Sequence, residues 1–185
     1  MSRLTPIAVL VKNERGVLSR VSGLFARRGF NITSLAVGET ENPAYSRITL
    51  VAEVDAASRE QLIKQLNRLV AVIEVADLSA ESRVERGLAL VKVKAGQETR
   101  HQLVELAQIF RAAINHIDHE SMILEVSGDR GKVAAMIDML SPYGILEMAR
   151  TGQIALGRET TLRRTCTPIP LADEATTEGG IYNHY

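Results

Sequence analysis

The feature of this sequence that most constrains its fold is an order of strands and helices that occurs twice. In the first 80 residues, strand-like runs of apolar and β-branched residues alternate with two helix-like stretches. The order is strand, helix, strand, strand, helix, strand, or βαββαβ. The same order begins again near residue 88, at an offset of about 80 residues, which indicates a structural duplication. Sequence identity between the two halves is weak, so only the pattern repeats.

The first half supplies four strands and two helices. The strands are predicted at residues 5–11, 31–39, 45–54 and 70–78. The first helix is predicted from apolar residues on one helical face, followed by Gly29, where a helix commonly ends. These apolar residues are Val17, Leu18, Val21, Leu24 and Phe25. Ser58 is the predicted N-cap of the second helix, which carries Leu62, Ile63, Leu66 and Leu69.

The second half repeats this order. Its strands are predicted at residues 88–94, 114–118, 122–126 and 145–149, and its helices at 98–110 and 132–140. Residues 79–86 form a polar and charged joint between the halves, and periodicity is lost after Gly157. We therefore expect one domain over residues 1–79, a second over residues 80–158 and a flexible tail over residues 159–185.

A βαββαβ unit folds into a four-stranded antiparallel sheet with both helices on one face. The predicted fold class is therefore α+β, with two ferredoxin-like βαββαβ domains in tandem. In a single copy, the other face of each sheet and its edge strands stay uncovered. Because such faces and edges usually pair with another subunit, we expect an oligomer.

The composition excludes several classes of protein. Lys and Arg total 22 and Asp and Glu total 22, and this zero net charge argues against nucleic-acid and membrane-surface binding. The N-terminus does not resemble a signal peptide, and no run approaches the roughly 20 apolar residues of a membrane span. A single cysteine, Cys166, cannot form an intrachain disulfide. We expect a cytoplasmic protein that binds neither nucleic acid nor membrane.

The most informative stretch joins the first predicted strand to the first helix. It reads Asn13-Glu14-Arg15-Gly16-Val17-Leu18. Gly16 allows a ligand to approach the backbone, and the unpaired N–H groups of the first helical turn suit a small carboxylate. The side-chain oxygens of Asn13 and of Asn31, at the start of the next strand, can accept from an ammonium group. The stretch thus favours a site for a free α-amino acid, although a turn glycine with two turn asparagines is an open alternative.

Residues 10–35 read LVKNERGVLSRVSGLFARRGFNITSL. They resemble the N-terminal ACT domain of the acetolactate synthase (acetohydroxyacid synthase) small subunit. The shared pattern is N-x-x-G-x-L-x-R-x-x-x-L-F-x-x-R-G-x-N-I, and it is matched from Asn13 to Ile32. Further matches include Leu90-Val91-Lys92, Ile109-Phe110-Arg111 and Ala149-Arg150-Thr151-Gly152, so the resemblance covers residues 3–158.

The resemblance implies a non-catalytic regulatory subunit that forms a homodimer. Valine, or leucine or isoleucine in its place, would bind between the protomers. Asn13, Gly16, Val17 and Leu18 would come from one protomer, and Asn31 and Ile32 from the other. The partner would be the large catalytic subunit, which joins pyruvate to a second 2-keto acid and which the second domain would activate. Thiamine diphosphate, Mg and FAD are expected only in that catalytic subunit, and the resemblance assigns no role to residues 159–185 or to Cys166.

Other candidate sites are weaker. His116-Ile117-Asp118-His119-Glu120 holds four possible metal ligands, but a strand places them on different faces, so we predict surface residues and no metal. The run from Ser127 to Val133 resembles a phosphate-binding loop but lacks its spacing, and we interpret it as a strand-to-helix turn.

Three other functions fit less well. An amino-acid-responsive transcription regulator needs a helix-turn-helix or basic element, which neither half leaves room for. An enzyme needs converging acid, base or nucleophilic groups, and an RNA-binding protein needs stacking aromatics on its central strands. The regulatory subunit is the favoured interpretation, and an amino-acid-sensing ACT protein that regulates a different partner is the alternative.

Overall fold

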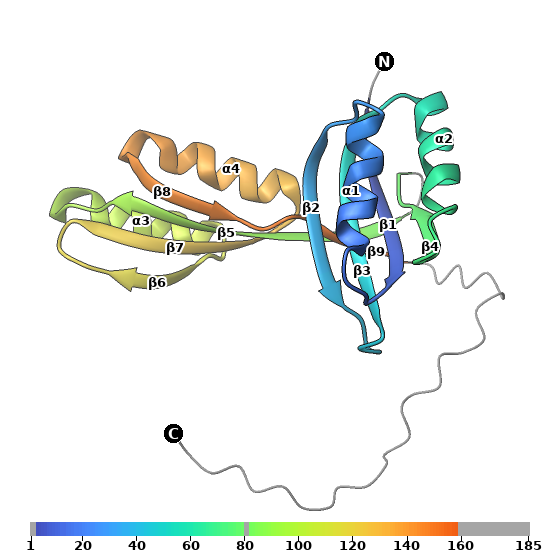
Figure 1. The fold of residues 1–185 in the computed structure, drawn as a ribbon. Helices are drawn as coiled ribbons and strands as arrows, with labels where there is room; N and C mark the ends of the chain where they lie inside the picture. Colours follow the sequence, from blue (N-terminus) through green and yellow to red (C-terminus); the bar gives the residue numbers. More distant parts are fainter. Residues whose placement is uncertain (1–2, 80–81, 159–185) are drawn as a thin grey trace, which may run out of the picture.

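The computed structural model of the chain describes residues 3–79 and 82–158 (Figure 1). The first half contains β1 (Arg3–Lys12), α1 (Val17–Arg27), β2 (Ile32–Glu39), β3 (Tyr45–Val54), α2 (Ala56–Leu66) and β4 (Val72–Asp77). The second half contains β5 (Arg83–Lys94), α3 (Gln97–Ile109), β6 (Ala113–Ile117), β7 (Ser121–Gly128), α4 (Arg130–Leu140), a 3-10 turn (Ser141–Tyr143), β8 (Ile145–Arg150) and β9 (Ile154–Gly157). The predicted tail and Cys166 lie outside the described residues.

The two halves build two antiparallel sheets of the same strand order. The first sheet runs β2-β3-β1-β4 and the second β6-β7-β5-β8. In Figure 1, α1 and α2 lie on one side of the first sheet, and residues of both α3 and α4 pack into one core with the second sheet. The predicted fold class, two βαββαβ ferredoxin-like units in tandem, is confirmed.

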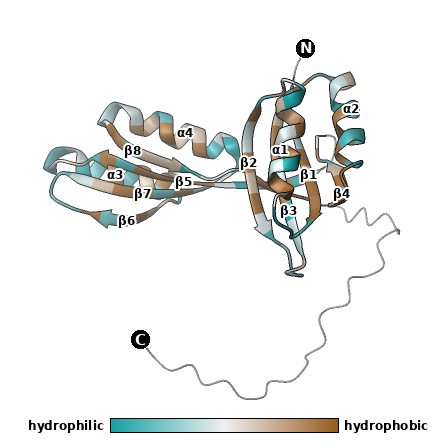
Figure 2. Ribbon diagram, viewed as in Figure 1, coloured by the Kyte–Doolittle hydropathy of each residue, from teal (hydrophilic) through white to brown (hydrophobic). Residues whose placement is uncertain are grey.

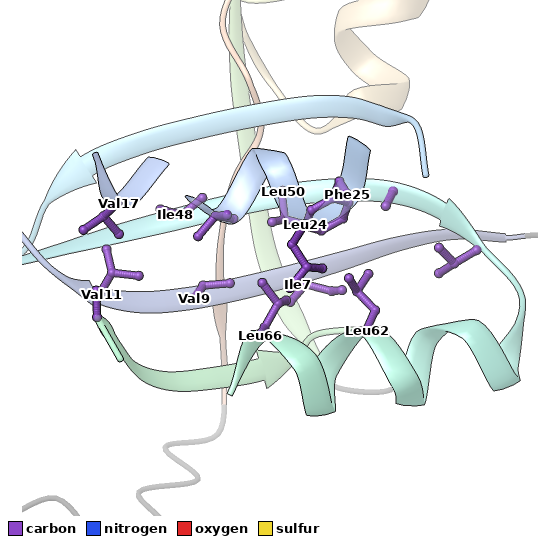
Figure 3. Packing of buried hydrophobic residues seen from close by; sticks show 14 residues of the cluster. Ile7, Val9, Val11, Val17, Leu24, Phe25, Ile48, Leu50, Leu62 and Leu66 are labelled. Carbon is purple, nitrogen blue, oxygen red and sulfur yellow. The ribbon is translucent and has the colours of Figure 1, made fainter. Parts of the chain in front are cut away.

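Each sheet has its own hydrophobic core. Figure 3 shows Val17, Leu24 and Phe25 of α1 packed with Ile48 and Leu50 of β3 in the first core. Hydrophobic and hydrophilic residues alternate around the helices in Figure 2, as expected for helices with one buried face. The two main cores share no residue, so each half buries its own apolar surface.

Helix α1 ends as its sequence predicts. Gly29 follows the helix with a φ of 68°, and its N–H donates to Ala26 O over 3.1 Å. The N–H of Phe30 donates to Phe25 O over 3.0 Å, and the two phenylalanine rings meet edge to face. This is the Schellman arrangement, in which a left-handed glycine and a hydrophobic contact close a helix.

The start of α2 differs from the prediction. Asp55, and not Ser58, is the N-cap: its carboxylate accepts the N–H of Ser58 over 2.8 Å. Asp55 has extended backbone, as an N-cap must, whereas Ser58 already lies inside the helix. The helix also ends at Leu66, so Leu69 packs against the core from the following turn, and β4 begins at Val72 rather than at residue 70.

The joint predicted over residues 79–86 is also partly wrong. Arg83–Arg86 is the beginning of β5, and it pairs antiparallel with β9 over Ile154–Gly157. We call these two four-residue stretches the ribbon. Neither stretch shows a clear apolar alternation, because charged residues occupy three positions of the first and the second is too short.

The ribbon changes the expectation that the helix-free face of each sheet is uncovered. In Figure 1 it passes behind the first sheet, and Ala155 packs with Ala8 and Leu78 in a small buried cluster. Part of that face is therefore covered by the chain itself. Edge strand β2 pairs only with β3 among the described residues, so its outer edge is open.

None of the helices in the described part of the chain is long and apolar enough to cross a membrane.

Two leucines of α1 test how this helix packs. Leu24 is 5% exposed in the first core, whereas Leu18 is 42% exposed on the outer surface. Leu24→Ala is expected to lower the free energy of unfolding by about 2–5 kcal/mol, because it leaves a cavity. Leu18→Ala is expected to change it by less than about 1 kcal/mol. Urea denaturation of both variants measures the difference, and equal losses would contradict the orientation of α1.

Candidate functional site

The junction between β1 and α1 leaves backbone donors without a side-chain partner. Gly16 is the N-cap of α1, with a φ of 80° and a ψ of 0°, and it supplies no capping side chain. The first-turn N–H groups of a helix have no partner within the helix. In α2 and α4 an aspartate side chain, Asp55 or Asp129, accepts from one of them. In α1 the N–H of Val17 donates to Glu14 O over 3.5 Å, which leaves the N–H groups of Leu18 and Ser19 as the donors for a ligand. The first turn contains no acidic residue.

Asn13 lies beside this helix start with two of its polar groups already engaged. Its backbone N–H donates to Ala44 O over 2.8 Å. Its side-chain Nδ2 donates to Pro43 O over 3.0 Å and to Glu39 Oε1 over 3.2 Å. These bonds use the amide nitrogen, so the oxygen Oδ1 is the atom left to accept a proton from an ammonium group.

Glu39 is a residue that the sequence analysis missed. It lies at the end of β2, and the pairing of β2 with β3 and of β3 with β1 brings it level with the end of β1. Only this register places its carboxylate at Asn13, because the two residues are 26 positions apart. No local pattern in the sequence indicates such a pairing.

The two apolar residues predicted at the junction, Val17 and Leu18, differ in their exposure. The Val17 side chain is 4% exposed and belongs to the first core, so it is not available to a ligand. Leu18 is the neighbouring apolar side chain at the surface. The junction therefore combines backbone donors, one acceptor oxygen and one exposed apolar side chain.

Asn31 and Ile32 lie at the opposite end of the sheet. Ile32 pairs with Ala52, which pairs with Thr5 near the start of β1, whereas the Asn13 junction follows the end of β1. Ile32 and Glu39 are seven positions apart on β2, a distance of about 23 Å along the strand. Asn31 is exposed, and Ile32 is half-buried against the first core. One chain thus brings together Asn13, Gly16, Val17 and Leu18 but not Asn31 and Ile32.

The equivalent junction in the second half has different chemistry. Gly96 is the N-cap of α3 and also supplies no side-chain cap, but its φ is −69°. Glu98 lies in the first turn, where its negative charge opposes a carboxylate ligand. Residue 95 before this glycine is alanine, so no side-chain amide lies there. The amino-acid pattern of the first junction is not repeated.

The His116–Glu120 cluster extends from the end of β6 into the turn before β7. The Asp118 carboxylate accepts from the N–H groups of Glu120 and Ser121 over 2.8 and 2.7 Å, and from Ser121 Oγ over 2.7 Å. These hydrogen bonds, that of the Ser121 hydroxyl first, lower the pKa of Asp118 to about 2. Within residues 3–79 and 82–158, no three His, Cys, Asp or Glu side chains gather as they would around a metal ion.

The run from Ser127 to Val133 is a strand-to-helix turn, as predicted. Asp129 is the N-cap of α4, and its carboxylate accepts the N–H of Lys132 over 2.8 Å. The Lys132 ammonium donates to Ser127 O over 2.9 Å. The backbone N–H and the ammonium group of Lys132 are thus engaged in closing the turn.

Asp118 makes a testable contribution to stability. Since its pKa in the folded state lies below the ordinary value of 3.8, the charged carboxylate stabilises the fold above about pH 4. This contribution is expected to disappear as the pH falls from about 4 to about 2. Urea denaturation of the wild type and of Asp118→Ala should show a constant difference above pH 4 that shrinks below it. A difference that is independent of pH would contradict the assigned hydrogen bonds.

Comparisons with known proteins agree for both halves of the chain. Residues 7–74 match the family described as AHAS small subunit-like ACT domain, and residues 86–159 match the family described as small subunit of acetolactate synthase. A probable acetolactate synthase small subunit of Archaeoglobus fulgidus is 54% identical over 152 residues, which cover 82% of this chain and 95% of the relative. The acetolactate synthase small subunit of Mycolicibacterium smegmatis is 45% identical over 161 residues, which cover 85% of this chain and 95% of the relative.

A solved structure extends this similarity to the fold. The crystal structure of the acetolactate synthase small subunit from Thermotoga maritima has a TM-score of 0.78 and 42% identity. It covers 85% of this chain and 98% of its own. Sequence and fold agree over both sheets, and the chain therefore belongs to the family of acetolactate synthase small subunits.

Proposed function

We propose that this chain activates the thiamine-diphosphate-dependent catalytic subunit of acetolactate synthase and makes it subject to feedback inhibition by valine, leucine or isoleucine. The chain itself performs no catalytic step in this proposal. Membership in the small-subunit family supports the association with a catalytic subunit. The observation that carries the effector site is the β1–α1 junction, where uncapped helix donors lie beside the free oxygen of Asn13.

A branched-chain amino acid matches the chemistry of this junction. Its carboxylate would accept hydrogen bonds from the first-turn N–H groups of α1 and be attracted by the positive end of the helix dipole. Its ammonium group would donate to Asn13 Oδ1. Its apolar side chain would lie against Leu18, whose exposure is otherwise unfavourable.

A homodimer joined through the open edges of β2 would complete the site. Two copies related by a two-fold axis pair their β2 strands antiparallel, so the end of one β2 lies beside the beginning of the other. Asn13 hydrogen-bonds to Glu39 at the end of β2, and Asn31 precedes its beginning. Antiparallel pairing thus carries Asn31 and Ile32 of one protomer to the Gly16 junction of its partner, although they are remote within one chain.

The difference between the Gly16 junction and the Gly96 junction supports different functions for the two halves. We assign effector binding to residues 1–79 and activation of the catalytic subunit to residues 80–158. The support for this division is that the Gly96 junction has Glu98 in its first helical turn and alanine at position 95, the residue that follows β5 as Asn13 follows β1.

The charge of the residue at position 16 tests the proposed carboxylate site. Gly16→Asp is expected to weaken effector binding at least tenfold, equivalent to about 1.4 kcal/mol, because its carboxylate repels that of the ligand. Gly16→Asn is the matched control, since asparagine tolerates a positive φ and carries no charge. Gly96→Asp is a second control that should leave effector binding unchanged. Calorimetric titration with valine, leucine and isoleucine measures all four proteins, and equal affinities for Gly16→Asp and Gly16→Asn would refute the site.

Asn31 tests whether two protomers share each site. Asn31→Ala is expected to weaken effector binding about 10- to 150-fold, as for the loss of about 1.5–3 kcal/mol in a hydrogen bond to a charged group. The strength of the ligand-free dimer should barely change, because the exposed Asn31 side chain buries no apolar area. Calorimetry gives the first quantity and sedimentation equilibrium the second.

Mixed dimers give the decisive form of this test. A chain carrying Asn31→Ala is paired with a chain carrying Gly16→Asp. If the site is shared, one of the two sites combines an intact Gly16 with an intact Asn31, and half of the binding capacity returns. If no binding returns, each site is built within a single chain.

A further inference from the structure

The connection between β8 and β9 touches the backbone of β2. A Cβ atom added to Gly152 would lie 2.0 Å from Leu35 O, 2.3 Å from Leu35 C and 2.8 Å from Ala36 N. All three are backbone atoms of a paired strand, so they cannot turn aside as a flexible side chain can. Any residue other than glycine at position 152 must therefore displace either β2 or the connection that carries residue 152.

The next residue makes a directional contact with the same strand. The N–H of Gln153 donates to Ser34 Oγ over 2.8 Å, across 119 positions of sequence. We call the contact of Gly152 with Leu35 and of Gln153 with Ser34 the crossing. Ser34 lies three positions after Asn31, so the crossing lies on the strand that begins at the proposed effector contact.

The crossing is firmly attached to the second sheet. The N–H of Thr151 donates to Leu88 O over 2.9 Å, and the N–H of Leu88 donates to Thr151 Oγ1 over 2.9 Å. Leu88 belongs to β5, a central strand of that sheet. The residue directly before the crossing is therefore bonded to β5.

The two halves are otherwise joined by little apolar surface. Their main cores are separate, and the cluster that includes both a first-sheet residue and a ribbon residue contains only Ala8, Leu78 and Ala155, with Ala76 beside it. A cavity of about 510 Å³ lies beside the crossing, lined by Ser34 and Gly152 among others. Domains that share only a small apolar interface are expected to move relative to each other.

We propose that the crossing couples effector binding to the orientation of the second half of the chain. This inference rests on the proposed function, because it assigns the route by which an effector held at Asn31 reaches the residues assigned to activation. The docked arrangement, with Gly152 on Leu35, is one state, and the arrangement with the crossing displaced is the other. An effector that fixes the beginning of β2 binds the two states unequally and so shifts their populations.

The variant Gly152→Ala separates this role from effector binding. It is expected to bind the effector within about threefold of the wild type and to activate the catalytic subunit to at least half the wild-type level in the absence of effector. The effector concentration for half inhibition is expected to rise at least tenfold, within the 5- to 150-fold range of typical allosteric couplings. Ser34→Ala removes only the hydrogen bond and should act in the same direction, by about three- to fivefold.

Gly23→Ala is the control for the addition of a Cβ atom elsewhere. Gly23 lies within α1, and a Cβ atom there meets only the end of the Arg27 side chain, at 3.5 Å. This variant should resemble the wild type in effector binding, activation and inhibition. A general loss of stability would instead lower the melting temperature and weaken binding and activation together, which the comparison of binding with inhibition detects.

Three results would overturn the proposal. The first is inhibition of both Gly152→Ala and Ser34→Ala at the wild-type effector concentration. The second is a parallel loss of effector binding and inhibition in both variants, which would make the crossing part of the effector site. If Gly152→Ala fails to fold, Ser34→Ala alone decides between these results. The third is a wild-type chain that binds no branched-chain amino acid. Calorimetry detects this result before any variant is compared, and it would refute the proposed function itself.

Discussion

The arrangement of this chain depends on one long strand. β5 extends over twelve residues; its first four pair with β9 in the ribbon, and its remainder pairs with β7 and β8 inside the second sheet. A continuous hydrogen-bonded strand is stiff, so the ribbon behind the first sheet and the centre of the second sheet are parts of one element. The two halves can therefore keep separate cores and still be mechanically connected.

The candidate effector site follows from what the first sheet leaves unsatisfied. A helix start needs acceptors for its first N–H groups, and a side chain supplies one of these acceptors at α2 and at α4. At α1 the glycine that makes the turn possible also removes that acceptor. An open β2 edge is the second unsatisfied feature. A dimer that pairs those edges and a ligand that caps α1 would satisfy both, so effector binding and dimerisation would depend on each other.

Local patterns predicted most of this structure, and long-range contacts account for the errors. The spacing of Val17, Val21 and Leu24 identified α1, and Gly29 identified its end, because both signals lie within one helix. The N-cap of α2 was misplaced because Asp55 and Ser58 have similar capping propensities, and only the backbone conformation distinguishes them. β9 and the position of Glu39 could not be predicted, since each depends on pairing with residues far away in sequence.

Glycine is required at positions 16 and 152 for different physical reasons, and the difference is relevant to the proposed regulation. Gly16 has a positive φ and open space around it, so its requirement is conformational and stays within its own loop. Gly152 is required because another backbone occupies the place of a side chain, so its requirement is steric and involves both halves. A local requirement suits a binding site, which must hold its shape whether or not the halves move. A requirement shared by two moving parts suits a contact that responds to their movement. The proposed effector site and the proposed coupling contact are therefore distinct in their physics as well as in their positions.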